Sequence, residues 1–314
     1  MSNSTDRNNS LDLTGLNAYI NQESTELIAK SVFSAMSTRL FKVQTGVKAP
    51  TAINLLDTQV TFGDGKECGL DPMSAQAISQ RIITPGFIKV FLKYCHKDFY
   101  NTFASHLTNV AAGRETLPFE QYFIEDVIRN IGKELEVAIW QGDTAVENTN
   151  PNTNKFDGLL KLIDAEVTAG TIVNKYDVAQ NTMLKKVWAV YEAIPEEKLF
   201  DEVIYMNNAN FRKLVKELVD ANMYHYERTI DDTLDIILPG TMTHIKAVSG
   251  LTNQNVIVAM DPNHVVYACD MENDMETFKF WFSDDDDAFK LLVEFAAGTQ
   301  IALPSEVVYS NWNA

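Results

Sequence analysis

Two acidic runs are the strongest candidates for metal chemistry in this sequence. Asp284 to Asp287 places four carboxylates in succession, and hard cations bind several oxygen ligands. Residues 270–276 alternate Asp or Glu with other residues, like the ligands of a calcium loop. However, Met275 stands where that loop has glycine and Trp281 where it has glutamate. We therefore reject the calcium loop and interpret the four aspartates as a solvated turn.

The glycines and histidines also fail to form a catalytic or cofactor motif. Gly63, Gly65 and Gly69 resemble a phosphate cradle, but the dinucleotide fingerprint needs glycine where Cys68 stands. The histidines form no His-x-x-x-His pair and accompany no Gly-x-Ser-x-Gly motif; they are His96, His106, His225, His244 and His264. We predict no catalytic residue, no metal site and no cofactor, and expect the chain not to be an enzyme.

The net charge argues against a protein that binds nucleic acid through many phosphate contacts. The chain of 314 residues has a formal charge of −17, whereas phosphate binding needs clustered Lys and Arg. Its length allows two lobes, and a hydrophobic share of 46% is that of an ordinary globular protein with a sizeable core. Association of such acidic copies would require charges to be separated or neutralised, so we expect it to depend on salt or divalent cations.

Cysteine spacing and hydropathy indicate the cellular compartment in which the chain is made. Cys68, Cys95 and Cys269 are widely spaced and form no CxxC pair, which predicts neither a disulfide framework nor a zinc site and is consistent with a reducing cytoplasm. The polar start from Met1 to Ser10 does not have the pattern of a secretory signal, and no apolar run reaches about 18 residues. We expect no membrane association.

The first part of the chain predicts an arm followed by a projecting hairpin. Apolar residues fall at helical spacing from Leu16 to Val32. Short β-like pieces then run from Leu40 to Phe62 and end at the turn residues Gly63 to Gly65. An isolated two-stranded hairpin is marginally stable in water. We therefore expect this hairpin to lie on a partner.

A strand and two helices follow. The segment from Ile88 to Cys95 places Lys89, Phe91, Lys93 and Cys95 on one face of a strand and its other side chains on the opposite face. The spacing predicts a helix from Phe99 to Val110. A longer helix from Leu117 to Gln141 has one apolar stripe and stops before Gly142.

The second half reads as mixed helices and strands. Residues 143–155 form an Asn-rich loop, which is a candidate boundary between lobes. Beyond it, three helices and four strands are expected: Gly158–Glu166, Met183–Ala193, Asn210–Val219, and Val203–Met206, His244–Val248, Val256–Met260 and His264–Cys269. Alternating apolar residues at 278–295 predict a hairpin with an acidic tip, and Gln300–Tyr309 predicts a last strand interrupted by Pro304.

This order of elements resembles the major capsid proteins of tailed bacteriophages, whose fold is named after the phage Hong Kong 97. Five segments resemble the family's sequences: ITPGFIKVFLKYCHKDFY from Ile83, LPFEQYFIEDVIRNIGKELEVAIWQGD from Leu117, FDGLLKLIDAE from Phe156, LPGTMTHIKAVSGL from Leu238 and FAAGTQIALPSEVVY from Phe295. The resemblance in the order of elements extends over nearly the whole chain.

The resemblance implies an α+β fold in five parts. These are an N-terminal arm, an extended β-hairpin loop, a peripheral lobe with a long spine helix, an axial lobe and a C-terminal strand that returns to the peripheral lobe. Their expected ranges are 1–38, 39–74, 75–150, 151–294 and 295–314. Only a short polar stretch precedes Leu16, so the resemblance implies a scaffolding protein that is separate or absent.

By the same resemblance the chain is a capsid subunit. It would assemble in the host cytoplasm into hexamers and pentamers of a virion shell that encloses double-stranded DNA without binding it specifically. Its partners would be portal and scaffolding proteins, with cement or head-fibre proteins as further possibilities. The candidate subunit contacts are Phe41, Lys48, Phe62, Lys66, Glu125, Arg129, Lys133 and Glu136.

Two alternatives remain open at the level of sequence. An encapsulin-like nanocompartment subunit has the same fold but encloses cargo enzymes, so the enclosed material distinguishes it. A soluble hydrolase with an active site assembled from distant His and Asp residues is the other alternative, because spacing along the chain does not exclude it.

Overall fold

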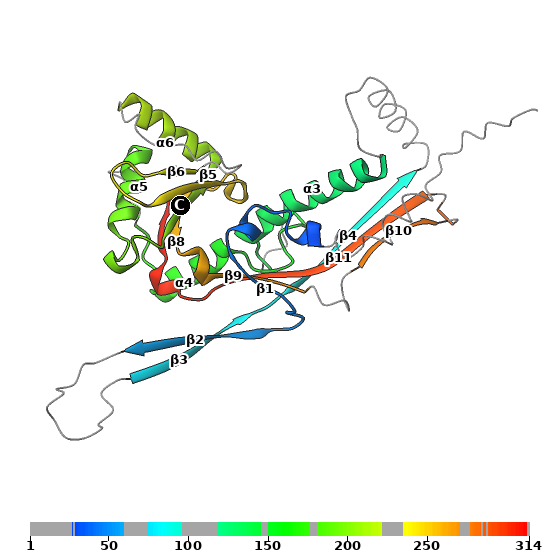
Figure 1. Ribbon diagram of the computed structural model, residues 1–314, viewed down its shortest axis with the longest axis horizontal. Coiled ribbons are helices and arrows are strands. Elements are labelled where there is room, and N and C mark those ends of the chain that lie inside the picture. Colours follow the sequence, from blue (N-terminus) through cyan, green and yellow to red (C-terminus); the bar gives the residue numbers. More distant parts are fainter. Residues whose placement is uncertain are drawn as a thin grey trace, which may run out of the picture.

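The residues that the structure describes form two five-stranded sheets, one separate two-stranded sheet and the helices that cover them (Figure 1). The computed structural model describes residues 27, 29–59, 75–95, 119–145, 150–175, 177, 181–221, 235–270, 277–283, 285–286 and 288–312. Within these residues the fold is α+β, as the sequence predicts. The described part also contains five short 3₁₀ helices: Ser37–Arg39, Glu196–Lys198, Ser249–Leu251, Pro262–His264 and Pro304–Glu306.

The first five-stranded sheet, called the long sheet here, is organised around β11 (Ala288–Ile301). Ala297 pairs with both Gly86 and Cys269, so β4 and β9 flank β11 on opposite sides. The other strands are β1 (Lys42–Gln44), parallel to β9, and β10 (Thr277–Ser283), antiparallel to β11. The bounds of the two flanking strands are Gly86–Cys95 for β4 and Val265–Cys269 for β9.

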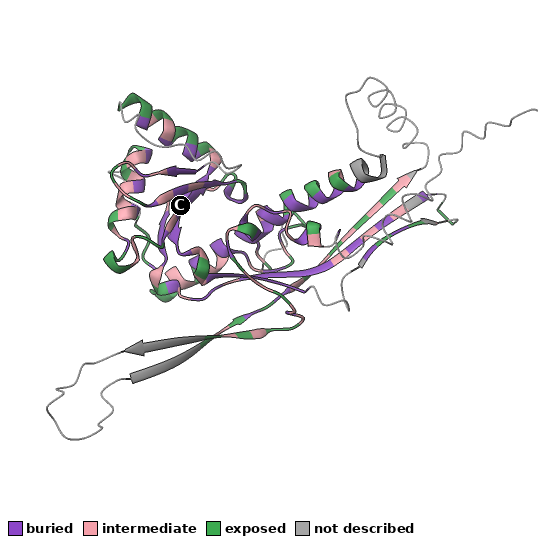
Figure 2. Cartoon of the chain, viewed as in Figure 1, coloured by how far each residue is buried: buried purple, intermediate pink, exposed green. Residues whose placement is uncertain are grey.

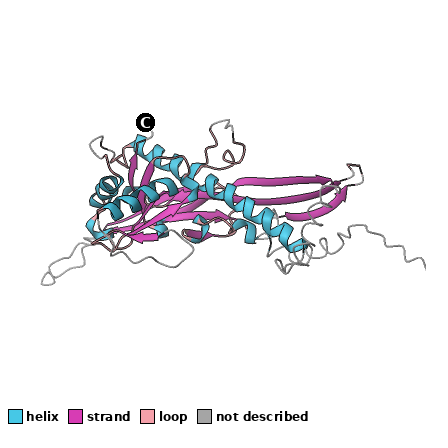
Figure 3. Cartoon of the chain, turned by 90° about the horizontal axis from the view of Figure 1, so that it is seen from above, coloured by secondary structure: helices cyan, strands magenta, loops and turns pink. Residues whose placement is uncertain are grey.

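The long helix α3 (Phe119–Gln141) lies along one face of this sheet (Figures 1 and 3). Its 23 residues give a length of about 34 Å. The predicted apolar stripe is confirmed where side chains are described, since Val127, Ile131, Leu135 and Ile139 are all buried. One side of the helix therefore packs on the sheet, and the opposite side faces away from it.

The second sheet, called the lobe sheet here, is buried on both faces. Its order is β12-β8-β5-β7-β6. One face packs under α5 and α6, and the other belongs to the core shared with α3 and α4. The bounds are Val203–Asn207, Asp235–Ile237, His244–Val248, Val256–Met260 and Val308–Asn311 for β5, β6, β7, β8 and β12, and Leu159–Ala169, Met183–Glu192 and Asn208–Asp220 for α4, α5 and α6.

The two-stranded sheet is a hairpin that reaches away from the rest of the chain (Figure 1). It consists of β2 (Thr51–Gln59) and β3 (Ala75–Ile83), paired in register from Thr51↔Ile83 to Gln59↔Ala75. Its base is fixed by a small cluster in which Val47 and Ile83 pack against β9 residues. A projecting hairpin is thus present, but both of its strands lie later in the chain than the sequence indicated.

Three boundaries predicted from the sequence are wrong. Residues 42–44 join β9 of the long sheet instead of the hairpin, while the hairpin extends to Ile83, beyond the expected end at residue 74. The strands β10 and β11 belong to the long sheet, although residues 277–294 were all assigned to the axial lobe. The final strand, β12, pairs with β8 in the lobe sheet and does not return to the long sheet.

Candidate assembly surfaces

The N-terminal segment at residues 29–39 is fixed to α3 by a buried hydrogen-bond network. The backbone N–H and the Oγ of Ser37 donate to the two carboxylate oxygens of Glu136, over 2.8 and 2.7 Å. The indole Nε1 of Trp140 donates in turn to Ser37 Oγ over 2.7 Å. All three residues are buried, and bonds to a buried charged group are stronger than neutral ones. The network sets the position of this segment on the helix.

Two glycines allow the close packing around this network. A Cβ on Gly132 would lie 2.6 Å from Ser34 Oγ and 3.0 Å from the Ser34 backbone carbon. A Cβ on Gly250 would lie 2.4 Å from the carbonyl oxygen of Glu136. These separations are shorter than van der Waals contact, so a side chain at either position would push the segment or the 3₁₀ turn off the helix.

Two predicted subunit contacts are internal instead. Burial raises the pKa of Glu136, against the effect of its hydrogen bonds from Ser37, and only 2% of the residue is exposed. Phe41 is 5% exposed and lies with its ring centroid 5.9 Å from those of both Trp140 and Tyr205. Both side chains are buried within the chain, Glu136 beneath Ser37 and Phe41 against Trp140 and Tyr205.

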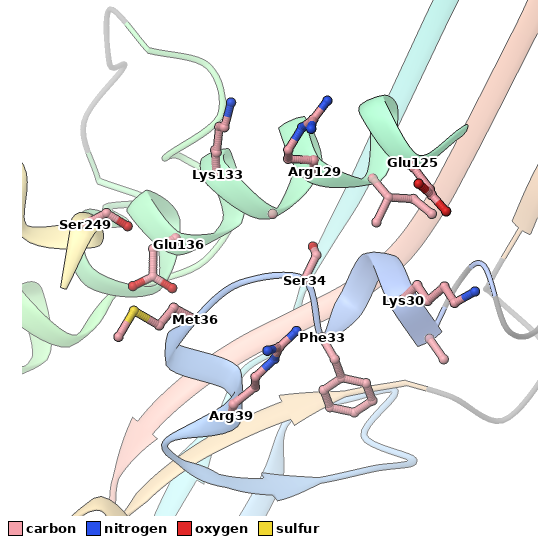
Figure 4. A pocket seen from close by; sticks show the side chains of 13 residues that line it. Lys30, Phe33, Ser34, Met36, Arg39, Glu125, Arg129, Lys133, Glu136 and Ser249 are labelled. Atoms are coloured by element: carbon pink, nitrogen blue, oxygen red, sulfur yellow. The ribbon is translucent and has the colours of Figure 1, made fainter. Parts of the chain in front are cut away.

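The remaining predicted residues on α3 come together at a groove between the helix and the N-terminal segment (Figure 4). This basic groove has a volume of about 710 Å³. Its apolar wall comes from Phe33, Met36 and Ile128, and its exposed charged rim consists of Lys30, Arg39, Glu125, Arg129 and Lys133. Four cations on the rim lie against Glu125 and against Asp126, which pairs with Arg129, so the groove is a positive surface on an acidic chain.

The hairpin is anchored at its base by polar contacts. The guanidinium of Arg81 lies 2.6 Å from the carboxylate of Glu166, and Gln300 Nε2 donates to the carbonyl oxygen of Ile82 over 2.6 Å. The side chain of Ile82 is 60% exposed. Of the residues predicted to flank the hairpin, Lys48 is half-buried just before β2, whereas Phe62 and Lys66 lie outside the described residues.

The outer face of the long sheet carries exposed aromatic residues between ion pairs. Phe87 and Phe91 on β4 are 58% and 48% exposed, and the Phe91 ring centroid lies 6.3 Å from that of Trp281 on β10. Lys89 pairs with Glu294 on β11 over 3.0 Å. The sequence placed Lys89, Phe91 and Lys93 on one face of a strand, but it did not single out that face as a surface for contact.

A carboxylate cluster lies where the chain crosses between the two sheets. Glu202 precedes β5 and is 2% exposed, and neither of its carboxylate oxygens has a hydrogen-bond partner. Burial, together with the charges of Glu306 and Asp261, raises the pKa of Glu202 to about 8. His264 lies 2.8 Å from Glu306 and thereby links the two crossing segments. The cluster is therefore sensitive to protonation.

At the acidic turn the structure describes Asp285 and Asp286, and Asp286 takes part in ion pairs. Asp286 contacts both Lys290 and Lys93, and these lysines lower the pKa of Asp286 to about 2. In the described parts of the chain, no three His, Cys, Asp or Glu side chains are arranged to hold a metal ion. The alternating acidic run at 271–276, the helix expected at Phe99–Val110, and His96, His106 and His225 lie outside the described residues.

None of the helices described has both the length and the apolar character needed to cross a lipid bilayer.

Solved structures similar to this chain come from viral and virus-like particles. A chain of the satellite phage P4 procapsid matches 95% of this chain and 95% of its own length, with a TM-score of 0.62 and 9% identity. A capsid chain of the empty GTA particle covers 90% of both chains, with a TM-score of 0.55 and 13% identity. A chain from Microbacterium phage Oxtober96 matches 88% of this chain and 90% of its own, with a TM-score of 0.52 and 13% identity.

No family model and no curated protein sequence matches the chain. The chain therefore shares its fold, over nearly its entire length, with proteins to which it is only 9% and 13% identical in sequence.

Proposed function

We propose that this chain is the major capsid protein of a tailed bacteriophage, with the Hong Kong 97-type fold. Copies of it assemble into hexamers and pentamers that close into an icosahedral head around double-stranded DNA. Residues 27–38, the β2–β3 hairpin, α3 and the lobe sheet correspond to the arm, extended loop, spine helix and axial lobe of that fold. Portal and scaffolding proteins, with cement or head-fibre proteins as further partners, complete the particle, which is built in the host cytoplasm.

The observation that carries this proposal is the isolated hairpin. A two-stranded sheet is marginally stable in water, because its backbone edges are unpaired and it has little core of its own. The hairpin β2–β3 is anchored at its base and then leaves the body of the chain (Figure 1). Such an element gains stability when it lies on a neighbouring subunit. The full-length similarity to capsid chains agrees with this role.

The charge of the chain also suits a container for DNA. With 43 acidic and 26 basic residues, a shell of this protein lacks the surplus of cations that would hold phosphates by counterion release. Packaged DNA would therefore remain free to slide along the inner wall. Strong retention of DNA by purified shells at physiological salt would contradict this part of the proposal.

The test is electron microscopy of the purified full-length chain at low and moderate salt, with and without a divalent cation. We expect rings of five or six copies, tubes or closed shells. Cages that enclose a host enzyme instead of nucleic acid would favour a nanocompartment subunit. A monodisperse monomer under every condition, with a scaffolding partner present, would overturn the proposal and revive the enzyme alternative.

A further inference from the structure

A second exposed feature lies far along the chain from the basic groove. The turn at Pro195–Asp201, called the acidic knob here, presents Phe200 with 78% of its surface exposed. Next to it in space is the loop of Met242, which is 72% exposed and is joined to the turn because Thr243 Oγ1 donates to the carbonyl oxygen of Leu199. Two large apolar side chains so strongly exposed on neighbouring loops mark a site of contact.

The acidic knob is held in one shape by its own bonds. The N–H of Lys198 donates to the Pro195 carbonyl, and the N–H of Asp201 donates to the Lys198 carbonyl, over 2.9 and 3.0 Å. The Lys198 ammonium lies 3.1 Å from Glu306, which fixes the turn to the carboxylate cluster. Little conformational entropy is therefore lost when such a turn binds.

The knob and the basic groove are complementary in both charge and polarity. Glu196, Glu197 and Asp201 are exposed around Phe200, whereas the single lysine of the turn is engaged with Glu306. The groove has an apolar wall and four cations on its rim. In Figure 4, Met36 of the N-terminal segment lies beside Glu136 of α3, and Arg39 lies beside Phe33. An apolar side chain surrounded by carboxylates matches these features.

We infer that the acidic knob of one copy of this chain docks in the basic groove of the next copy. Phe200 enters the apolar part of the groove, and the carboxylates of the knob face Arg39, Arg129 and Lys133. This inference rests on the proposed function and names one of the contacts between its subunits. Because the two surfaces differ, the contact is head-to-tail, and such contacts close into rings when the rotation between copies permits.

Charge reversal on each surface tests the contact in the full-length chain. One variant carries Glu196→Lys and Glu197→Lys, and the other carries Arg129→Glu and Lys133→Glu. Each variant alone places like charges on the knob and the groove of neighbouring copies. The concentration needed for half-assembly at low salt should therefore rise by about tenfold or more. The chain with all four substitutions should regain assembly. A Phe200→Ala variant should also assemble less readily.

Mixing the two reversed chains gives a sharper test. Each has two surfaces of one sign, so neither pairs with itself, while the mixture pairs in alternation. Rings with an even number of subunits should return and rings of five should not. The matched controls are Asp220→Lys and Lys216→Glu, exposed on α6, and they should assemble as the wild type does.

The inference is overturned if the reversed chains assemble normally, or if neither mixing nor the fourfold variant restores assembly while circular dichroism shows intact folds. If the wild type assembles but the variants give either of these results, the proposed function is retained and only this contact is rejected. A wild type that stays monomeric would remove both.

Discussion

The two five-stranded sheets differ in how far the two faces of their strands are buried within the chain. In the lobe sheet, β8 is buried at every position, because one face packs under α5 and α6 and the other joins the core around α3. In the long sheet, β4 alternates between half-buried residues that face α3 and exposed residues that face away (Figure 2). The lobe sheet is therefore packed on both faces within one chain. The long sheet leaves the outer face of β4 exposed.

This difference separates residues that hold the fold from residues that are available to neighbours. Removing apolar surface from water contributes roughly 25 cal/mol per Å², and the lobe sheet gains this within the monomer. The aromatic residues Phe87, Phe91 and Trp281 remain partly exposed in the isolated chain. Mutations in the two sheets should therefore affect different measurements, which the following predictions use.

The largest effect is expected from a charge in the lobe sheet. Val258 is fully buried on β8, and Val258→Asp places a carboxylate there without a partner. The free energy of unfolding should fall by more than about 4 kcal/mol, measured by urea denaturation. The matched change Phe91→Asp on the long sheet should alter that free energy by less than about 1 kcal/mol. Equal losses would remove the distinction between the sheets.

The carboxylate cluster between the sheets predicts a pH dependence. The pKa of Glu202 is raised to about 8 in the folded chain, so the folded state holds a proton that the unfolded state releases near its ordinary value of about 4.3. The stability that this proton contributes is present at low pH and is lost as the pH rises toward 8.

The variant Glu202→Gln should remove most of this pH dependence. At pH 8.5 it should be more stable than the wild type by roughly 4–5 kcal/mol, and at pH 5 the difference should shrink to about 1 kcal/mol. Urea denaturation across this range measures the difference, with Glu192→Gln as the exposed control. A constant difference between wild type and variant at every pH would contradict the burial of a neutral Glu202.

A smaller effect is expected where the N-terminal segment docks on α3. Ser37→Ala removes the hydroxyl that donates to one oxygen of Glu136 and accepts from the Trp140 indole N–H, while the backbone N–H of residue 37 keeps its bond to the other oxygen. The free energy of unfolding should fall by about 1–3 kcal/mol. The control is Ser249→Ala at an exposed position. Unchanged stability would show that the network does not fix the segment.

The smallest effect is expected at the base of the hairpin. Arg81→Ala removes a partly exposed ion pair with Glu166, and such pairs contribute at most about 1 kcal/mol. Hydrogen exchange in β2 and β3 should accelerate while exchange in β8 stays the same. Equal acceleration in both regions would indicate global unfolding and would contradict the independence of the hairpin.

Sequence patterns predicted the elements whose signals are local. The apolar stripe of α3 repeats at helical spacing, and the apolar runs at 244–248 and 256–260 define β7 and β8 with the observed bounds. The strand β1 has three residues and pairs with β9 more than two hundred positions later. No local signal specifies that pairing, so residues near Phe41 were attributed to the hairpin.

The candidate surfaces were predicted less completely, because they depend on tertiary packing. Arg129 and Lys133 were identified by their position on the polar side of α3, and they do line the basic groove. Glu136 lies on the same helix, but Ser37 and Trp140 bury it. The exposure of Phe200 could not be read from the sequence, since an apolar residue in a short acidic stretch is as often packed inward.

If the β2–β3 hairpin serves assembly and not folding, a chain without it should fold but not assemble. Sedimentation velocity should compare the wild type with a chain in which residues 55–79 are replaced by Asn-Gly, which joins the opposed residues Asn54 and Gln80 and keeps Arg81 in place. The account predicts large particles from the wild type, and a folded species no larger than a few copies from the shortened chain. Particles of the same size from both chains would contradict it.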